Sequence, residues 1–258
     1  MGRSIRQLTS ATALFLATLT LPCAIMASHP EGERPGRFKH IVIDPGHGGD
    51  NLGALSFNGV YEKGIVLAVA LALKQHVEAN SDIKVTLTRS TDKALTLQQR
   101  IEIANAAEAD LFLSLHANIA FNHTSKGAEV LVLSQEAMDK EAKRLTWVHV
   151  QRQGRLSDVE NNDAAAMVKE MMQHGGLVDA KEMGSFVLGR LAKKMKLATR
   201  GVKQGAYGVL KGAEMPAMVI EMGFLSNPDE AKNLSNQQYQ ERLAKALAEA
   251  IIEYAKQP

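Results

Sequence analysis

Short apolar runs recur along the chain, separated by segments in which apolar residues return every three or four positions. The runs predict strands at 40–44, 84–88, 111–115, 128–133, 206–210 and 217–222. The periodic segments predict helices at 63–77, 95–107, 183–195 and 243–254, with a further helix starting at Pro228. Strands that alternate with helices are typical of a largely parallel, twisted sheet flanked by helices. We therefore expect a single α/β domain.

The alternation stops after the expected strand at residues 128–133. Residues 134–181 are polar and contain several methionines, with a helical pattern at 164–173 and a Gly175-Gly176 pair that predicts a helix break. A stretch of this length is too long for an ordinary connection between elements. We expect either a functional helical insertion at 134–181 or a partly disordered loop.

The N-terminus has the layout of a secretory signal peptide. Arg3 and Arg6 precede an apolar run at 11–21, which is followed by a small-residue site ending at Ala27. The run is short for a membrane span, which favours export over anchoring. We expect a signal peptide at 1–27, a polar tether at 28–37, a catalytic domain at 38–258 and no integral membrane segment in the mature chain.

Composition narrows the possible partners. The chain has 30 Lys and Arg against 28 Asp and Glu, and removing Arg3 and Arg6 with the signal leaves 28 against 28. Nucleic-acid binding is typically accompanied by a concentrated basic surplus, so no nucleic acid is expected as a partner. Cys23 is the only cysteine and lies within the signal, so the mature chain folds without disulfides.

Four residues with metal-site chemistry lie at the ends of expected elements. His47 follows the first strand, His116 follows the strand at 111–115, Glu221 lies near the end of the strand at 217–222, and Glu62 opens the first helix. A sheet whose strands finish together brings such residues to one edge, where ligands bind in open α/β folds. An isolated histidine in a glycine-rich turn would be an ordinary turn residue, but the four together indicate a hydrolytic metal site.

Two imidazoles and one carboxylate can hold zinc with one position open, and the same trio can make an iron site of the oxygenase type. Zinc is preferred, since ferrous iron is hard to keep in an exported protein and a further carboxylate is present for hydrolysis. A carboxylate in the apolar strand around Glu221 is costly to bury unless it is paired, bound to metal or chemically used. We interpret Glu221 as a general base, the alternative being a salt-bridged core residue.

Weaker candidates surround this set. Asp44 and Asn118 flank the expected ligands and could orient them through hydrogen bonds, although turn and strand-end roles are equally ordinary. Arg89 and Arg100 are expected to pair with acids at element ends. The remaining histidines are expected to be surface or packing residues: His29, His40, His76, His123, His149 and His174.

At these residues the sequence resembles the zinc-dependent N-acetylmuramoyl-L-alanine amidases of amidase family 3, which cut bacterial peptidoglycan. The resemblance rests on IVIDPGHGG at 41–49, the helix start at Glu62, RIEIANAAEADLFLSLHAN at 100–118 and VIEMGFLSNPDE at 219–230. It implies Zn²⁺ held by His47, Glu62 and His116, with Glu221 as the catalytic carboxylate. It also implies the scissile bond, between the lactyl group of muramic acid and L-alanine, and a monomeric, periplasmic or otherwise exported enzyme.

The insertion resembles the regulatory segment of the cell-division amidases. In those relatives an inserted helix places a glutamate on zinc until a coiled-coil activator with a degenerate metallopeptidase domain pulls it away. Glu160 is the best candidate for that glutamate, although a solvated helix start explains it equally well. The resemblance implies a role in cell-wall remodelling and daughter-cell separation. Two other functions remain open, a non-catalytic wall-binding module and an iron-dependent oxygenase.

Overall fold

A computed structural model describes residues 37–136 and 159–257, with side chains at 37–136 and 176–257. The expected signal peptide at 1–27, all of the tether except Arg37, and residues 137–158 of the expected insertion lie outside it. Glu160 lies on a described helix, but its side chain is outside the described ones. Among the helices searched, none is long and apolar enough to cross a membrane.

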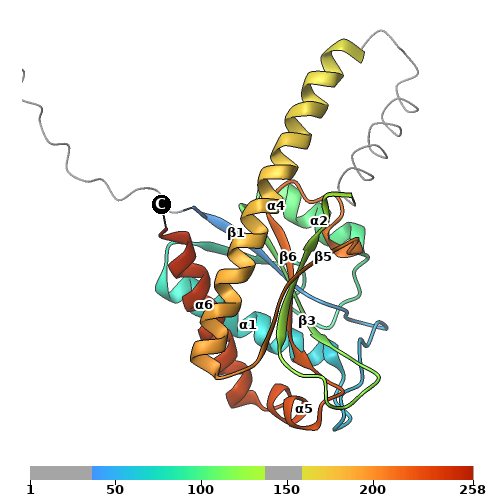
Figure 1. The fold of residues 1–258 in the computed structure, drawn as a ribbon, viewed down its shortest axis with the longest axis vertical. Coiled ribbons are helices and arrows are strands. Elements are labelled where there is room, and N and C mark those ends of the chain that lie inside the picture. The colour runs from blue at the N-terminus through green and yellow to red at the C-terminus, as the bar shows by residue number, and fades with distance from the viewer. Residues whose placement is uncertain (1–36, 137–158, 258) are drawn as a thin grey trace, which may run out of the picture. The chain divides into compact units, whose positions relative to one another are not determined.

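Six strands form one mixed sheet in the order β2-β1-β3-β6-β4-β5 (Figure 1). Strands β2, β1, β3 and β6 run parallel, β4 runs antiparallel to β6, and β5 runs parallel to β4. The largely parallel sheet is confirmed. The strands are β1 (His40–Pro45), β2 (Lys84–Leu87), β3 (Leu111–Asn118), β4 (Ala128–Leu133), β5 (Thr199–Gly205) and β6 (Ala217–Phe224).

Helices cover both faces of this sheet, unequally. The first face packs against α1 (Glu62–Asn80), α6 (Gln237–Ala255) and the C-terminal part of α4 (Val159–Met195) through the main hydrophobic core. The second face carries a smaller apolar cluster under α2 (Leu97–Ala106) and a single 3₁₀ turn. Figure 1 shows α4 and α6 side by side over the first face. The second face is therefore the one with room for polar chemistry.

Local sequence signals set the start of three helices. Thr96 and Gln99 form a reciprocal capping box at the start of α2. Asn227 accepts hydrogen bonds from two backbone amides at the start of α5 (Pro228–Leu234), where proline occupies the first turn, and Asn236 accepts one from the Tyr239 amide at the start of α6. These caps satisfy amides that have no partner inside the helix.

Two expectations about the C-terminal half are wrong. The strand expected at 206–210 is instead β5 at Thr199–Gly205, and the apolar residues after it form the 3₁₀ turn Gly208–Leu210, with Leu210 buried. Strand β5 lies at the sheet edge and is largely exposed, so it lacks the apolar run of a covered strand. The expected break at Gly175-Gly176 is absent, because α4 continues to Met195. A Cβ on Gly176 would lie 3.3 Å from Pro216 N, so glycine here fits a close approach rather than a helix end.

Candidate metal centre

The loop that carries His47 is held by two buried arginines. His47 follows β1 with a φ of 60°, in the left-handed region that is uncommon for residues other than glycine. Arg100 donates to the carbonyls of Pro45 and His47, and Arg89 donates to those of Pro45 and Gly46. The loop is thus fixed through its backbone, and the unusual dihedral is stabilised by contacts on both sides.

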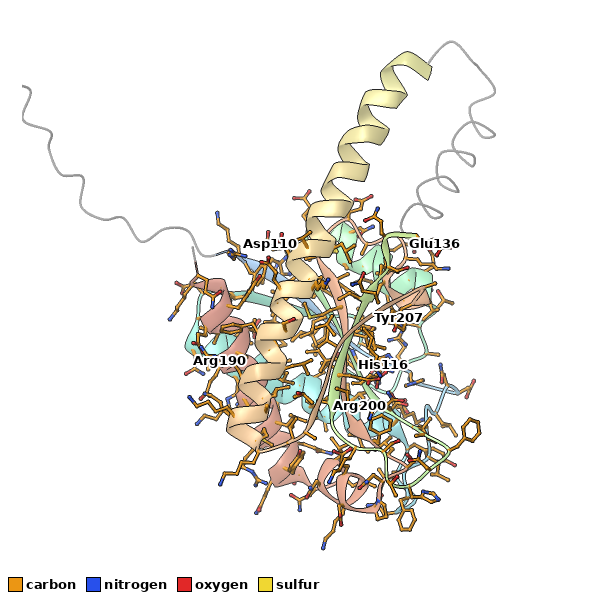
Figure 2. The ribbon with its side chains drawn as sticks, viewed as in Figure 1. Asp110, His116, Glu136, Arg190, Arg200 and Tyr207 are labelled. Carbon is orange, nitrogen blue, oxygen red and sulfur yellow. The ribbon has the colours of Figure 1, made fainter. Side chains whose placement is uncertain are left out.

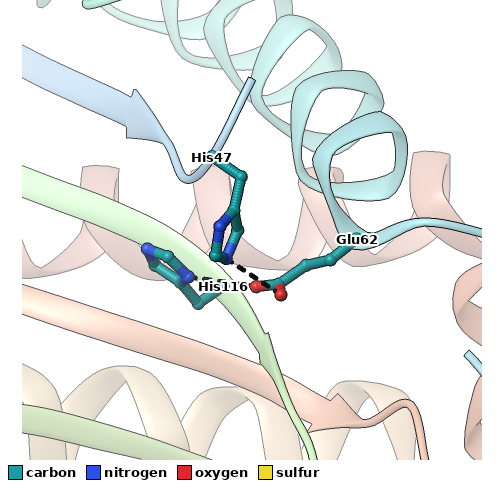
Figure 3. Close-up of side chains that lie close together, drawn as sticks. All are labelled: His47, Glu62 and His116. Atoms are coloured by element: carbon teal, nitrogen blue, oxygen red, sulfur yellow. Dashed lines mark hydrogen bonds and ion pairs between the residues drawn. The ribbon is translucent and has the colours of Figure 1, made fainter. Parts of the chain in front are cut away.

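Three expected ligands converge at the ends of β1 and β3 and the start of α1 (Figure 3). Glu62 Oε2 lies 2.9 Å from His47 Nε2, and Glu62 Oε1 lies 3.0 Å from His116 Nδ1. One ligand atom from each of the three lies within 4.8 Å of the others. Two imidazole nitrogens and one carboxylate oxygen at this separation are a donor set that can hold a divalent metal ion.

Neighbouring groups orient the trio. Asn51 Oδ1 lies 2.9 Å from His47 Nδ1, which leaves Nε2 for the metal side. The backbone amides of Ala54 and Ala117 donate to the two oxygens of Glu62. Gly46 packs so closely on His116 that a Cβ there would lie 2.3 Å from the imidazole ring. The ligands are therefore positioned by the fold itself.

The charges in the trio are mutually stabilised. Burial alone would raise the pKa of Glu62, but hydrogen bonds from His116 and His47 hold that pKa well below its usual range. Burial lowers the pKa of His47, and the contacts with Glu62 outweigh it, so the net pKa is raised. The carboxylate is 4% exposed and stays ionised, which makes it a ready ligand for a cation.

Glu221 lies on β6 in register with His116 on β3. Neighbouring strands are about 4.8 Å apart, so both side chains project from the same face beside the trio. Desolvation raises the pKa of Glu221 to about 7, and the neighbouring carboxylates of Glu62 and Glu129 add to the rise. Its Oε2 atom is buried and has no hydrogen-bond partner within the described part of the chain. Among the described residues no cation lies within ion-pair distance of Glu221, which favours the general-base interpretation over that of a salt-bridged core residue.

The flanking residues act differently from what was expected. Asp44 is fully buried and touches no ligand side chain; it accepts hydrogen bonds from Arg100, Thr88 and Ser114. Its effect on His47 passes through Arg100, which binds the His47 carbonyl. Arg100 thus pairs with an acid as expected, whereas Arg89 binds backbone carbonyls instead.

Asn118 does not orient the ligands, because its side chain donates to Glu129. Three of the other histidines have ordinary roles: His40 contacts Thr86, His76 pairs with Glu241, and His123 contacts the carbonyl of Ser226. His29 and His149 lie outside the described residues, and the side chain of His174 lies outside the described side chains.

Sequence reasoning missed the polar groups next to Glu221. Glu129 on β4 is in register with Glu221 and 3% exposed, and it pairs with Arg200 and Lys203 on β5. Burial and the charges of Glu129 and Glu221 raise the pKa of Tyr207. The sequence does contain a signal for Glu129, because this carboxylate interrupts an apolar strand just as Glu221 does.

Comparison with known proteins identifies the family. The sequence pattern of the family described as N-acetylmuramoyl-L-alanine amidase matches residues 41–253. The chain belongs to this family. It is 33% identical over 235 residues to N-acetylmuramoyl-L-alanine amidase AmiA of Escherichia coli K12, covering 88% of this chain and 80% of the relative. It is 32% identical over 232 residues to AmiC of Escherichia coli O6:H1, covering 88% of this chain and 56% of that longer relative.

Solved structures of amidases share the fold. An N-acetylmuramoyl-L-alanine amidase from Clostridium difficile 630 aligns with a TM-score of 0.65 at 26% identity, covering 85% of this chain and 97% of the other. The catalytic domain of CwlV from Paenibacillus polymyxa aligns with a TM-score of 0.61 at 29% identity, covering 84% and 97%. His47, Glu62 and His116 of this family member therefore lie in a fold that its relatives also use.

Proposed function

We propose that this protein hydrolyses the amide bond between the lactyl group of N-acetylmuramic acid and L-alanine in peptidoglycan, with Zn²⁺ as its cofactor. The observation that carries the proposal is the convergence of His47, Glu62 and His116 beside a buried, unpartnered carboxylate oxygen of Glu221. The names of the amidase relatives support the bond that is cut.

The roles of the side chains follow from this geometry. Zinc held by the trio would lower the pKa of a bound water to about 7 and polarise the amide carbonyl. Glu221 would accept the proton of the attacking water and deliver it to the departing amine nitrogen of L-alanine. In the metal-free protein burial raises the pKa of Glu221 to about 7, so the group is able to take and release a proton near neutral pH.

Digestion of purified sacculi tests the proposal. Mass spectrometry should detect peptides with a free L-alanine amine, and cleavage within the peptide or the glycan would contradict it. Glu221→Gln should lower kcat by about 10²- to 10⁴-fold, the usual contribution of a general base, without loss of bound zinc. Glu102→Gln on the exposed side of α2 is the matched control and should leave the rate unchanged.

Metal analysis after gentle purification separates the remaining alternatives. An iron-dependent oxygenase would contain iron and consume oxygen, and a non-catalytic wall-binding module would bind zinc without any turnover. About one zinc per chain, together with amide hydrolysis that stops on chelation and returns with zinc, would exclude both.

We further propose that the protein is exported to the periplasm or cell wall and acts in daughter-cell separation under the control of residues 134–181. Along α4, Glu160 lies beyond Gly176, which packs at the amino end of β6 away from the metal trio, so the insertion would have to rearrange for Glu160 to occupy the open metal position and displace the water that catalysis needs. A partner of the coiled-coil activator class would remove it. The solved complex of the CwlD amidase from Clostridioides difficile with the GerS lipoprotein shows that a family member can bind a protein partner.

Substitution of Glu160 tests the regulatory role. Glu160→Ala should raise basal activity on purified peptidoglycan in the absence of any activator, because the open metal position becomes available to water. The neighbouring Asp163→Ala serves as the control for a general effect on the helix. Unchanged basal activity in Glu160→Ala would contradict the assignment.

A further inference from the structure

A charged cluster extends the second face of the sheet beyond Glu221. Glu129 on β4 is in register with Glu221 on β6, and its Oε2 atom contacts both Arg200 and Lys203 on β5. The Nε atom of Arg200 lies 3.0 Å from that oxygen, and the guanidinium also lies over the Phe224 ring, 5.1 Å from its centroid. Figure 2 shows Arg200 and Tyr207 near His116, toward the end of the sheet formed by β4 and β5.

The cluster contains more positive charge than its buried acid requires. Glu129 is 4% exposed at its side chain, and one cation would be enough to compensate it. Two cations share it, and both remain accessible, with Arg200 40% and Lys203 43% exposed. Asn118 donates a further hydrogen bond to the same carboxylate. The arrangement therefore holds two donors in fixed, accessible positions, with one unit of positive charge more than Glu129 compensates, a unit that Glu221 offsets when it is ionised.

A second border of the metal trio has a different character. Residues 51–61, which lead from the His47 loop to Glu62, include no Asp, Glu, Lys or Arg. Leu55, Phe57 and Tyr61 are exposed along this segment. Phe57 contacts Leu225 after β6 and His123 after β3, so the site is bordered by an uncharged segment beyond the carboxyl ends of β3 and β6 and by cations on the β5 side.

The proposed substrate has the same asymmetry. Its scissile bond joins a neutral glycan strand to a stem peptide that carries free carboxylates. Arg200 and Lys203 contact the carboxylate of Glu129 on β4, and β4 lies one strand, or about 5 Å, from β6. Two extended peptide residues span about 7 Å, which is enough to cover this distance. A peptide that leaves the metal across β6 and β4 would bring a carboxylate of its second or third residue within reach of Lys203 and Arg200.

We propose that Arg200 and Lys203, held by Glu129, form a binding site for a carboxylate of the stem peptide and so set the direction in which substrate crosses the metal. This inference rests on the proposed amidase function. The site would act on substrate binding, since the contact lies away from the reacting atoms and is the same before and during reaction.

Two synthetic muramoyl peptides test this site. They are identical except that the free carboxyl of the second peptide residue is amidated in one of them. The wild-type full-length chain should hydrolyse the peptide with the free carboxylate with a kcat/KM about three- to tenfold higher. This preference lies between the effects of exposed ion pairs and of charge-assisted hydrogen bonds. The difference should appear in KM rather than in kcat. Lys203→Met and Arg200→Met should each reduce this preference, whereas Lys245→Met on α6, over the other face, should keep it.

Glu129→Gln should change the substrate preference in the direction opposite to Lys203→Met and Arg200→Met. It removes the compensating charge while keeping hydrogen-bond capacity, so the preference for the carboxylate should rise above the wild-type ratio. The ratio of two substrates with one enzyme cancels any change in kcat caused by Glu221 next door. Equal rates on both substrates, or wild-type ratios in both Lys203→Met and Arg200→Met, would overturn the carboxylate site while leaving amidase function intact. Hydrolysis of neither substrate, by the wild-type chain and by Glu160→Ala alike, would contradict the proposed function and this site with it.

Discussion

Replacing Arg100 by methionine should separate stability from metal binding. Arg100 is 2% exposed and pairs with the fully buried Asp44 at 2.7 Å. The same guanidinium donates to the carbonyls of Pro45 and His47. Arg100→Met therefore removes a charge partner in the core and a donor that holds the ligand loop.

The stability loss can be worked out from the contacts. Removing one member of a buried ion pair costs about 3–5 kcal/mol, because the remaining charge is left uncompensated. For a domain of 150–250 residues, each kcal/mol lowers Tm by about 2–4 °C, so a loss of roughly 6 to 20 °C is expected. Asp44→Asn combined with Arg100→Met removes both charges, keeps one acceptor oxygen for the Thr88 or Ser114 hydroxyl and offers the other hydroxyl an N–H donor, so much of the loss should be recovered.

Metal affinity should not follow stability in the two variants. The carbonyls of Pro45 and His47 lose their Arg100 contacts in both, so zinc affinity should fall by about 10- to 100-fold in both, the range for groups that support metal ligands. Unfolding is measured with chelator present, since bound metal would add stability of its own. Affinity is measured separately by competition with a zinc indicator.

The control is Arg242→Met, which changes an exposed arginine on α6 and should alter the free energy of unfolding by no more than about 0.5 kcal/mol. If Arg100→Met unfolds like this control, the pair with Asp44 contributes no net stability. If the double variant regains wild-type zinc affinity together with stability, Arg100 does not position His47 through its carbonyl.

Three further outcomes are expected. Gly46→Ala should reduce zinc affinity, because the new Cβ would lie 2.3 Å from the His116 ring. Gly64→Ala is the control and should leave zinc affinity unchanged, because a Cβ there meets no atom within 4 Å. Both affinities are measured by competition with a zinc indicator. Leu191→Ala on α4 should lower the free energy of unfolding by about 2–5 kcal/mol in a denaturant titration, as for other buried leucines. Burial raises the pKa of Glu221 from 4.5 to about 7, so ionisation costs the metal-free folded state up to about 3 kcal/mol above pH 7 and nothing below pH 4.5. Glu221→Gln should accordingly be more stable than wild type at pH 8, with the gain lost at pH 4.5, and the opposite trend in thermal melts would contradict this reasoning.

The fold and the convergence at the metal site could be read from the sequence because both follow from strand ends. A parallel sheet places its carboxyl ends together, so His47, His116 and Glu221 had to meet if their strands were adjacent. Strand order itself has no local signal, and β4 reverses direction without any mark in its own sequence. Edge strand β5 was missed for a related reason, since half-exposed polar residues carry no apolar run.

Side-chain partners were harder to predict than backbone positions. Arg89 binds carbonyls and Asn118 binds Glu129, and neither choice leaves a trace in residue spacing. Glu129 was detectable in principle by the same argument that singled out Glu221. Its two cations were not, because they come from a strand about 70 positions later along the chain.

The reversed direction of β4 determines where the long connection after it departs. Glu129 lies level with Glu221, and Leu133 follows four residues further toward the amino end of β6, roughly 13 Å away at about 3.3 Å per residue. The connection is therefore anchored at the margin of the sheet remote from His47 and His116. Its length and sequence can change without moving β1 or β3, the strands that position His47 and His116.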